Sequence, residues 1–255
     1  MNRATLSDAK YRDLFGDRDA SAPEDDPEFM TILRRLIFGE IFFIGDLDDQ
    51  TRELITVVVL TTTQMLSQLK AHTGAAPNVG VTPVEVREAV YQCAPFIGLP
   101  PTLNAIGVIN EVFRSRGIDL PLPAQAAADE DERYDKGKAI QVPLYGDEIR
   151  NDLDDLPDEL RDVVPRLLTE FCFGDFYTRT GLDVARRELL VLCLLAALGG
   201  TDAQLRPHTL GNLKVGNTKT TQIAALIHSL PYIGFPRALN AIRIVRQVTD
   251  PAKPS

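Results

Sequence analysis

The sequence predicts an all-α protein that contains the same multi-helix unit twice. Three observations predict this fold class. Residues 72–110 and 208–246 are identical at 14 of 39 positions, where about two or three identities would arise by chance at this composition. Helix start and stop signals recur in both copies. No segment shows convincing period-two alternation or the Asn-Gly type of turn that predicts a β-hairpin.

Composition and charge narrow the class of protein. The chain has 255 residues, of which 44% are apolar and 25% charged, as in ordinary soluble globular proteins. The net charge of −9 argues against a nucleic-acid partner and against an anionic membrane surface, because both need clustered Lys and Arg. Three widely spaced cysteines exclude a disulfide framework and suit a reducing cytosol. We therefore expect a cytoplasmic protein. No His/Cys cluster has the spacing of metal ligands, so we also expect no metal site.

Neither a membrane span nor a secretory signal is visible. The most apolar stretch, Leu189 to Leu198, is too short to cross the ~30 Å hydrocarbon core of a bilayer. Residues 1–10 have mixed charge and lack the apolar core of a signal peptide. We therefore expect no membrane partner.

The first element that the two copies define is a helix in the middle of each unit. Ile55 to Thr63 is rich in β-branched residues and is also compatible with a buried strand. Its counterpart, Glu188 to Leu198, is rich in Leu and Ala and favours a helix. Because two copies of one unit should share one fold, we predict a helix in both places.

Boundaries of the following helices are marked as well. Thr82 to Glu85 combines an N-cap, a proline at the first helical position and a capping-box glutamate. We expect this helix to end at a turn over 95–100. The next helix should run over 101–113 and close at Gly117. The second copy repeats this order from Thr218 to Val248.

A linker separates the two copies. Leu120 to Glu132 is first rich in Pro and Ala and then acidic, which indicates an exposed connection. We place the boundary near residue 125. Residues 1–125 then form the first unit with an N-terminal extension and the linker, and residues 126–255 form the second unit.

Both copies contain a glutamate and a histidine at matching positions. Glu53 and His72 of the first unit correspond to Glu188 and His208 of the second. Between them lies Gly199-Gly200 in the second copy and a weaker helix break in the first. If the flanking helices fold back antiparallel, a rise of ~1.5 Å per residue brings each Glu nearly level with its His, more closely in the first unit. A carboxylate beside an imidazole fixes the ring tautomer and makes a usable acid–base pair.

Other readings of these residues stay open. Arg52 and Arg187 precede the two glutamates and are candidates to hold an anionic substrate, but a Glu next to Arg at a helix start is also a common surface pair. A single histidine is more often structural than catalytic, whereas recurrence at equivalent positions favours a site. His228 has Gln92 as its counterpart, and we predict that it is structural.

These segments resemble the carboxymuconolactone decarboxylase family. The resemblance rests on Arg186 to Leu189, Gln204 to His208 and Tyr232 to Asn240 in the second copy, and on Thr51 to Leu54, Gln68 to His72 and Phe96 to Asn104 in the first. Glu132 to Gly137 also resembles the helix that opens such units. The resemblance covers about residues 28–118 and 132–248, and its motifs identify the superfamily rather than a substrate.

The resemblance implies an all-α fold and an obligate oligomer, typically six units arranged as a trimer of dimers. A chain with two units resembles a fused dimer, so a homotrimer would rebuild the ring. The peroxidase branch of the superfamily requires a Cys-x-x-Cys pair before the histidine. Here those positions hold Met65 and Gln68 in one unit and Thr201 and Gln204 in the other. Without a thiolate to attack a peroxide, that branch is excluded.

The decarboxylase branch implies a lyase that acts on a small carboxylated lactone or related carbonyl compound, as in aromatic compound degradation. Such a substrate takes up the electron pair itself, so neither a metal nor an organic cofactor is required. The implied catalytic residues are His72, His208, Glu53 and Glu188, with His as general acid; the implied substrate-binding residues are Arg52, Arg187, Arg206 and Lys70. The second unit is slightly favoured as the working one because Arg206 and Arg187 make it more basic.

A second function class stays open beside the enzyme. The same scaffold could serve as a non-catalytic oligomeric protein that binds a ligand. The two classes differ in whether the Glu–His pairs lie enclosed in the protein or point into solvent. The substrate, and whether both units are active, are not encoded in these motifs.

Overall fold

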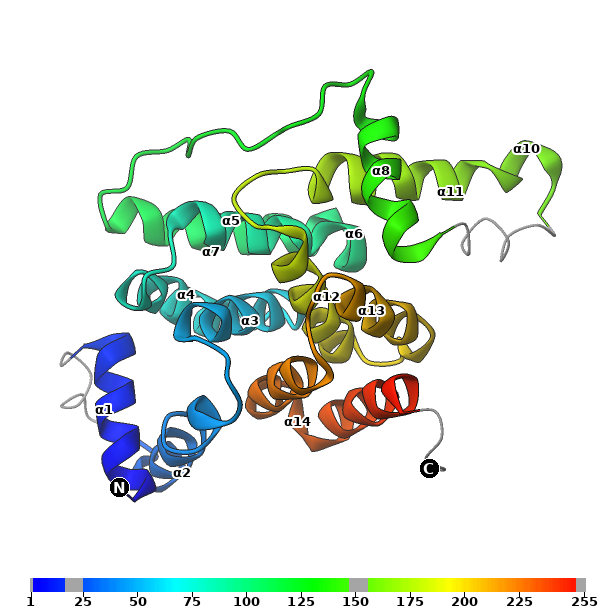
Figure 1. Ribbon diagram of the computed structural model, residues 1–255. Helices are drawn as coiled ribbons and strands as arrows, with labels where there is room; N and C mark the ends of the chain where they lie inside the picture. Colours follow the sequence, from blue (N-terminus) through cyan, green and yellow to red (C-terminus); the bar gives the residue numbers. More distant parts are fainter. Residues whose placement is uncertain (1, 17–24, 147–155, 251–255) are drawn as a thin grey trace.

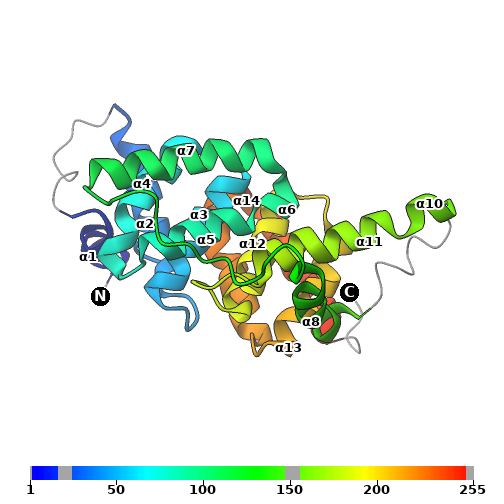
Figure 2. The ribbon, with the colours of Figure 1, turned by 90° about the horizontal axis from the view of Figure 1, so that it is seen from above.

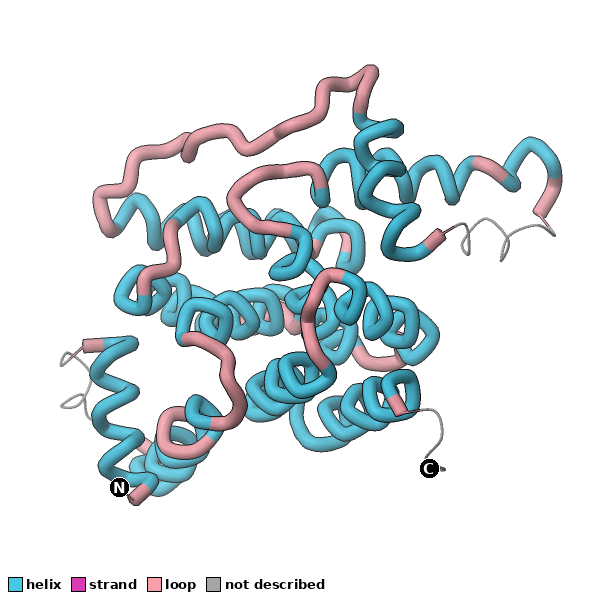
Figure 3. The backbone as a smooth tube through the Cα atoms, viewed as in Figure 1, coloured by secondary structure: helices cyan, strands magenta, loops and turns pink. Residues whose placement is uncertain are grey.

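The computed structural model describes residues 2–16, 25–146 and 156–250. The helices of both units pack into one body, which Figures 1 and 2 show in two perpendicular views. Every regular element within these residues is helical, with no strand among them (Figure 3). The predicted all-α fold with two tandem units is confirmed.

The first unit begins with a helical hairpin and continues as a bundle. Its elements are α1 (Arg3–Phe15), α2 (Pro27–Ile37), η2 (Ile41–Phe43), α3 (Asp49–Thr62), α4 (Leu66–Ala75), η3 (Ala76–Val79), α5 (Pro83–Gln92), α6 (Ala94–Ile97) and α7 (Leu99–Ser115). The capping box at Thr82 is formed, and its hydroxyl accepts from the backbone N–H of Glu85 at 3.2 Å. The turn predicted over 95–100 is wrong, because α6 continues to Ile97, α7 begins at Leu99 and only Gly98 (φ 85°) separates them.

The second unit repeats this order. Its elements are α8 (Arg133–Tyr145), α10 (Asp158–Arg161), α11 (Val163–Leu167), the π-helical η4 (Leu168–Tyr177), α12 (Val184–Leu198), α13 (Asp202–Lys214) and α14 (Lys219–Thr249). α8, α12 and α13 correspond to α1, α3 and α4. α14 covers the positions of α5 to α7, and its non-helical residue Gly234 (φ 79°) stands where Gly98 (φ 85°) separates α6 from α7.

The two central helices, α3 and α12, start in the same way. The side chain of Asp48 caps α3 by accepting from the backbone N–H of Thr51 at 2.7 Å, and Asp183 caps α12 by accepting from Arg186 at 2.7 Å. Both helices are buried along most of their length. Burial explains why the β-branched run of α3 is helical, since packing on all sides outweighs a weak intrinsic preference.

A single hydrophobic core joins the two units. α3 and α12 pack against each other, and α14 of the second unit covers α3. Two glycines mark matching close approaches: a Cβ on Gly45 would lie 2.5 Å from the Cβ of Ala224, and one on Gly181 would lie 3.0 Å from the Cγ of Glu88. These reciprocal contacts indicate an approximate two-fold relation between the units.

The linker runs along the surface from α7 to α8 (Figure 1). Arg87 of α5 donates to the carbonyl oxygens of Leu122 at 3.2 Å and Pro123 at 2.8 Å. The backbone N–H of Thr180 donates to the carbonyl oxygen of Gln125 at 3.0 Å. Most residues of the linker are exposed or half-buried. These hydrogen bonds fix the path of the linker over the surface.

A buried ionic network holds the units together. Arg187 of α12 donates to Glu88 of α5 at 3.2 Å, and both side chains are fully buried. Glu88 also accepts from Arg179 at 2.8 and 3.0 Å. Removing one member of a buried pair leaves an uncompensated charge, which is far more costly than breaking an exposed pair.

We predict that Glu88→Gln lowers the free energy of unfolding by about 3–5 kcal/mol, because Arg87, Arg179 and Arg187 all lose their counter-charge. The matched control is Glu111→Gln, which removes the exposed partner of Lys70 and should cost at most about 1 kcal/mol. Chemical denaturation of both variants checks this. Equal, small losses in the two variants would contradict the structural role of Glu88.

Candidate functional site

The first unit brings Glu53 and His72 together in its interior. Glu53 lies in the first turns of α3, and His72 lies on α4, which folds back after a break at Gln64 (φ 57°). The Nδ1 atom of His72 lies 2.7 Å from Oε1 of Glu53. Glu53 is 0% exposed and His72 is 7% exposed. Because Nδ1 faces the carboxylate, Nε2 is the ring nitrogen left for chemistry.

The second unit pairs Glu188 with His208 in a more crowded arrangement. Nδ1 of His208 lies 3.2 Å from Oε2 of Glu188 and 2.7 Å from the hydroxyl of Tyr145. The Tyr145 hydroxyl donates to Oε2 of Glu188, and the Tyr177 hydroxyl donates to Oε1 at 2.5 Å. Burial and the charge of Glu188 raise the pKa of both tyrosines. Both hydroxyls therefore stay protonated and act as donors.

The expected proximity of each Glu to its His is confirmed. The pair of the first unit is the closer one, as the helical rise on either side of the break predicts. Both pairs are enclosed rather than pointing into solvent. The catalytic roles of these four residues stay predictions.

Arg52 and Arg187 are buried and fully engaged. Arg52 donates to four backbone carbonyl groups, those of Ile41, Ile44, Gly45 and Leu47, at 2.8–3.3 Å. Arg187 donates to Glu88, Gln92 and backbone carbonyl groups. This placement favours a structural role over the substrate-binding role that the sequence predicts.

Lys70 and Arg206 lie on the exposed faces of α4 and α13. Lys70 pairs with Glu111 at 3.3 Å, and Arg206 donates to Gln247 at 3.0 Å. They occupy equivalent positions in the two units. Neither contact involves the Glu–His pairs, so the structure does not bring these cations to the site.

Two residues of α14 complete the site of the first unit. The Nε2 atom of His228 lies 3.1 Å from the hydroxyl of Thr56, and the Tyr232 ring lies 5.9 Å from the His72 ring. Burial lowers the pKa of His228 to about 3, and the charge of Arg52 acts in the same direction. His228 is therefore neutral at physiological pH.

Sequence reasoning missed this contribution of α14. His228 has no histidine counterpart and is predicted to be structural, and that prediction is not tested by the structure. Its packing across the unit boundary places it against Thr56 and Phe42 of the first unit. His228 lies one helical turn before Tyr232, and Tyr232 begins a segment that carries the family resemblance. That spacing is the signal in the sequence that could have identified His228. Tyr145 and Tyr177 were missed too, because they lie outside the matched motifs.

The three cysteines are buried, and their thiols stay protonated at physiological pH. Burial raises the pKa of Cys193 to about 12 and that of Cys93 and Cys172 even more. Among residues 2–16, 25–146 and 156–250, no group of three or more His, Cys, Asp or Glu side chains is arranged to hold a metal ion. In the same ranges no helix is both long and apolar enough to cross a membrane.

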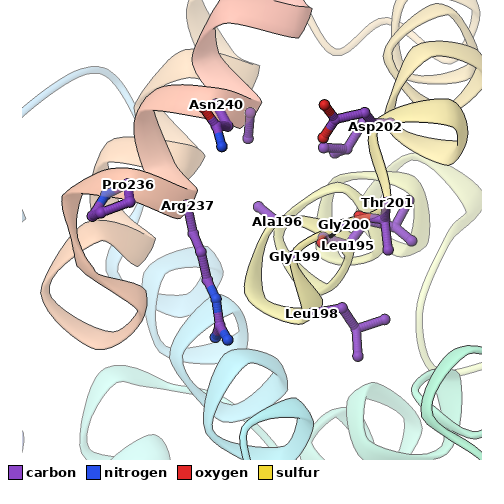
Figure 4. Close-up of a pocket in the computed structure, with 12 residues that line it drawn as sticks. Leu195, Ala196, Leu198, Gly199, Gly200, Thr201, Asp202, Pro236, Arg237 and Asn240 are labelled. Atoms are coloured by element: carbon purple, nitrogen blue, oxygen red, sulfur yellow. Dashed lines mark hydrogen bonds between the residues drawn. The ribbon is translucent and has the colours of Figure 1, made fainter.

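A separate cleft of about 290 Å³ lies at the turn between α12 and α13 (Figure 4). Arg237 and Asn240 border it on one side, with Thr201 and Asp202 on the other. Two of its polar side chains bond to the backbone: Arg237 donates to the carbonyl oxygen of Ala197 at 2.7 Å, and Thr201 donates to that of Leu195 at 2.7 Å. The cleft is distinct from the Glu–His pairs.

Comparisons with known proteins agree with this architecture. The model of the carboxymuconolactone decarboxylase family matches residues 27–111 and 163–247. The 4-carboxymuconolactone decarboxylase of Acinetobacter baylyi is 33% identical over 91 residues, which span 36% of this chain and 68% of that protein. The nitrosuccinic acid decarboxylase of Metarhizium robertsii is 31% identical over 124 residues, 46% of this chain and 80% of that protein. Each unit of this chain thus matches one copy of the family's domain, and the chain belongs to the carboxymuconolactone decarboxylase family.

Proposed function

We propose that the protein is a decarboxylase-like lyase that acts on a small carboxylated lactone or related carbonyl compound. The observation that carries the proposal is the buried, hydrogen-bonded Glu–His pair in a member of this family. Two relatives named as decarboxylases support it, since their names state that one acts on 4-carboxymuconolactone and the other on nitrosuccinic acid. A carboxylate next to an electron-withdrawing group is common to both compounds.

The proposed reaction needs one proton and a place for one electron pair. Loss of carbon dioxide breaks a carbon–carbon bond and leaves the electron pair on the adjacent carbon, where the carbonyl group of the substrate delocalises it. A protonated His then gives its Nε2 proton to that carbon and regains a proton from water. Glu53 at Nδ1 holds the ring of His72 in the orientation that this transfer requires.

Enclosure of the pairs favours the enzyme over a non-catalytic binding protein. A buried carboxylate is costly unless it is paired, and here each one is paired with an imidazole that can exchange a proton. Exclusion of water also strengthens the interactions of charged groups in the site and protects a carbanion from side reactions.

We predict that decarboxylation depends on one of the two histidines. Carbon dioxide release from 4-carboxymuconolactone and from nitrosuccinic acid is measured for His72→Ala, His208→Ala and the double variant. Loss of a positioned general acid lowers the rate by about 10²–10⁴-fold, so at least one single variant should lose that much with its melting temperature retained. A full rate in the double variant would contradict the proposed role.

We also propose that the chain forms a homotrimer, as the family resemblance implies. Both units expose large apolar side chains at equivalent positions of α7 and α14. Leu103 is 63% exposed and its counterpart Leu239 is 51% exposed, and Leu99 and Phe235 form a second such pair. Repetition of an exposed apolar surface by the two-fold relation suits a ring in which every unit makes the same contact.

Light scattering at micromolar concentration should give about three times the 28.1 kDa mass of one chain. The double substitution Leu103→Glu/Leu239→Glu places charges in the proposed contact and should lower the measured mass without loss of helical signal. The mass of a single chain for the unmodified protein would rule out the oligomer.

A further inference from the structure

The two Glu–His sites differ at the end of the first helix of each unit. Phe15 at the end of α1 occupies the place that Tyr145 occupies at the end of α8. The Phe15 ring lies 5.4 Å from the His72 ring, and the Tyr145 ring lies 5.1 Å from the His208 ring. The first unit thus has the same aromatic wall without the hydroxyl group.

A second aromatic pair differs in the same way. Phe42 packs on Phe38 with ring centroids 5.5 Å apart and an interplanar angle of 34°. Tyr177 packs on Phe173 at 4.9 Å and the same angle. The counterpart of the second tyrosine is therefore also a phenylalanine in the first unit.

These two differences decide whether both oxygens of the glutamate have hydrogen-bond partners. Each oxygen of Glu188 accepts a hydrogen bond from a tyrosine hydroxyl, Oε2 from Tyr145 and Oε1 from Tyr177. Oε1 of Glu53 contacts His72, but Oε2 is buried and has no hydrogen-bond partner in the part of the chain that the structure describes.

Backbone packing accompanies the difference. A Cβ on Gly211 of α13 would lie 2.8 Å from the Tyr145 hydroxyl oxygen and 2.9 Å from Oε2 of Glu188. The counterpart of Gly211 is Ala75 of α4, which carries that Cβ. Tyrosine therefore occurs with glycine in one unit, and phenylalanine with alanine in the other.

Each site is completed by the opposite unit, again with different groups. Tyr232 of the second unit lies against His72, and Phe96 of the first unit lies against His208 with ring centroids 5.8 Å apart. One turn earlier stand His228 and Gln92, respectively. The carbonyl oxygen of the Gln92 side chain accepts from Arg187 at 2.9 Å.

The two side chains that the second unit contributes to the first site each have a polar atom without a hydrogen-bond partner among the described residues. The Tyr232 hydroxyl and Nδ1 of His228 are buried without a hydrogen-bond partner among the described residues. Thr56 Oγ1 donates to the carbonyl oxygen of Arg52 at 3.0 Å, so Nε2–H of neutral His228 donates to Thr56 and Nδ1 remains an acceptor. Burial and the charge of Glu53 raise the pKa of Tyr232, and the nearby Thr56 side chain lowers it by less. The Tyr232 hydroxyl therefore stays protonated and is a donor, although Thr56 lies outside hydrogen-bond geometry with it.

Unpaired buried polar atoms are rare in folded proteins because each carries the cost of lost hydration. Here the unpaired atoms are an acceptor on Glu53, an acceptor on His228 and a donor on Tyr232. Glu53 contacts His72, the Tyr232 ring lies 5.9 Å from the His72 ring, and His228 contacts Thr56 of the same helix as Glu53. At the second site, within the described ranges, one such atom remains, Nε2 of Gln92. A concentration of unpaired groups of both kinds is typical of a site that a polar ligand completes.

We propose that the working site is that of Glu53 and His72, with the Tyr232 hydroxyl as a hydrogen-bond donor to the substrate and His228 as a substrate acceptor. At the Glu188–His208 site the two tyrosines already occupy both oxygens of Glu188, and we assign that site a structural role. This inference rests on the proposed function and reverses the preference for the second unit that its basic residues suggested. It assigns one substrate to each chain, bound by residues of both units.

The test compares the same change, loss of one tyrosine hydroxyl, at the two sites. Tyr232→Phe should lower kcat/KM by about 10²-fold, as for loss of one transition-state donor, without lowering the melting temperature. Tyr145→Phe should leave kcat/KM unchanged and lower the melting temperature by about 2–4 °C, because it removes one of the hydrogen bonds to the buried carboxylate of Glu188. His228→Gln, which introduces the residue of the other unit, should also lower kcat/KM.

A complementary variant closes the first site. Phe15→Tyr combined with Ala75→Gly introduces at Glu53 the contact that Tyr145 makes with Glu188 and should abolish activity, whereas Ala75→Gly alone should retain it. Equal loss of kcat/KM in Tyr232→Phe and Tyr145→Phe, or loss in Tyr145→Phe alone, would overturn the proposal.

Failure of the proposed function gives a different result. If the unmodified protein releases no carbon dioxide from either compound, the decarboxylase proposal fails, but the melting temperatures still test the assignment of the sites. Tyr232→Phe as destabilising as Tyr145→Phe would mean that both hydroxyls are structural, and would overturn the inference independently of any activity.

Discussion

The packing of α3 against α12 is the constraint on which the rest of the structure depends. Each helix begins with an Arg-Glu pair, and burial of the helices carries both charged residues into the interior. The arginines are satisfied by backbone carbonyl groups and, in the second unit, by Glu88. The glutamates are left to pair with the histidines of α4 and α13. The Glu–His pairs of both sites thus result from the packing of α3 against α12.

Duplication within one chain allows the two sites to differ, which identical subunits could not do. The structure uses this freedom at matching positions: phenylalanines face Glu53 where tyrosines bind Glu188, and the opposite unit supplies His228 and Tyr232 to one site but Gln92 and Phe96 to the other. Saturated hydrogen bonds add stability, whereas unpaired groups are retained where a ligand uses them. We propose that one site stabilises the fold and that the other binds the substrate.

Local patterns in the sequence predict much of the fold. The repeat resolves the ambiguous β-branched run over 55–63, the capping box at Thr82 marks α5, and the helical rise places Glu53 level with His72. The composition of the sites could not be predicted in this way, because Tyr232, His228 and Tyr145 reach them by packing between elements distant in sequence. Arg52 and Arg187 were expected at a substrate, but only tertiary structure reveals the carbonyl groups that engage them.

A high-resolution crystal structure of the protein, with its ordered water, would show whether the two sites differ as proposed. We predict a water molecule or a bound ligand atom within hydrogen-bond distance of Oε2 of Glu53, the Tyr232 hydroxyl and Nδ1 of His228, and direct tyrosine contacts at both oxygens of Glu188. A Tyr232 hydroxyl bonded straight to Glu53, or solvent between Glu188 and its tyrosines, would contradict this prediction.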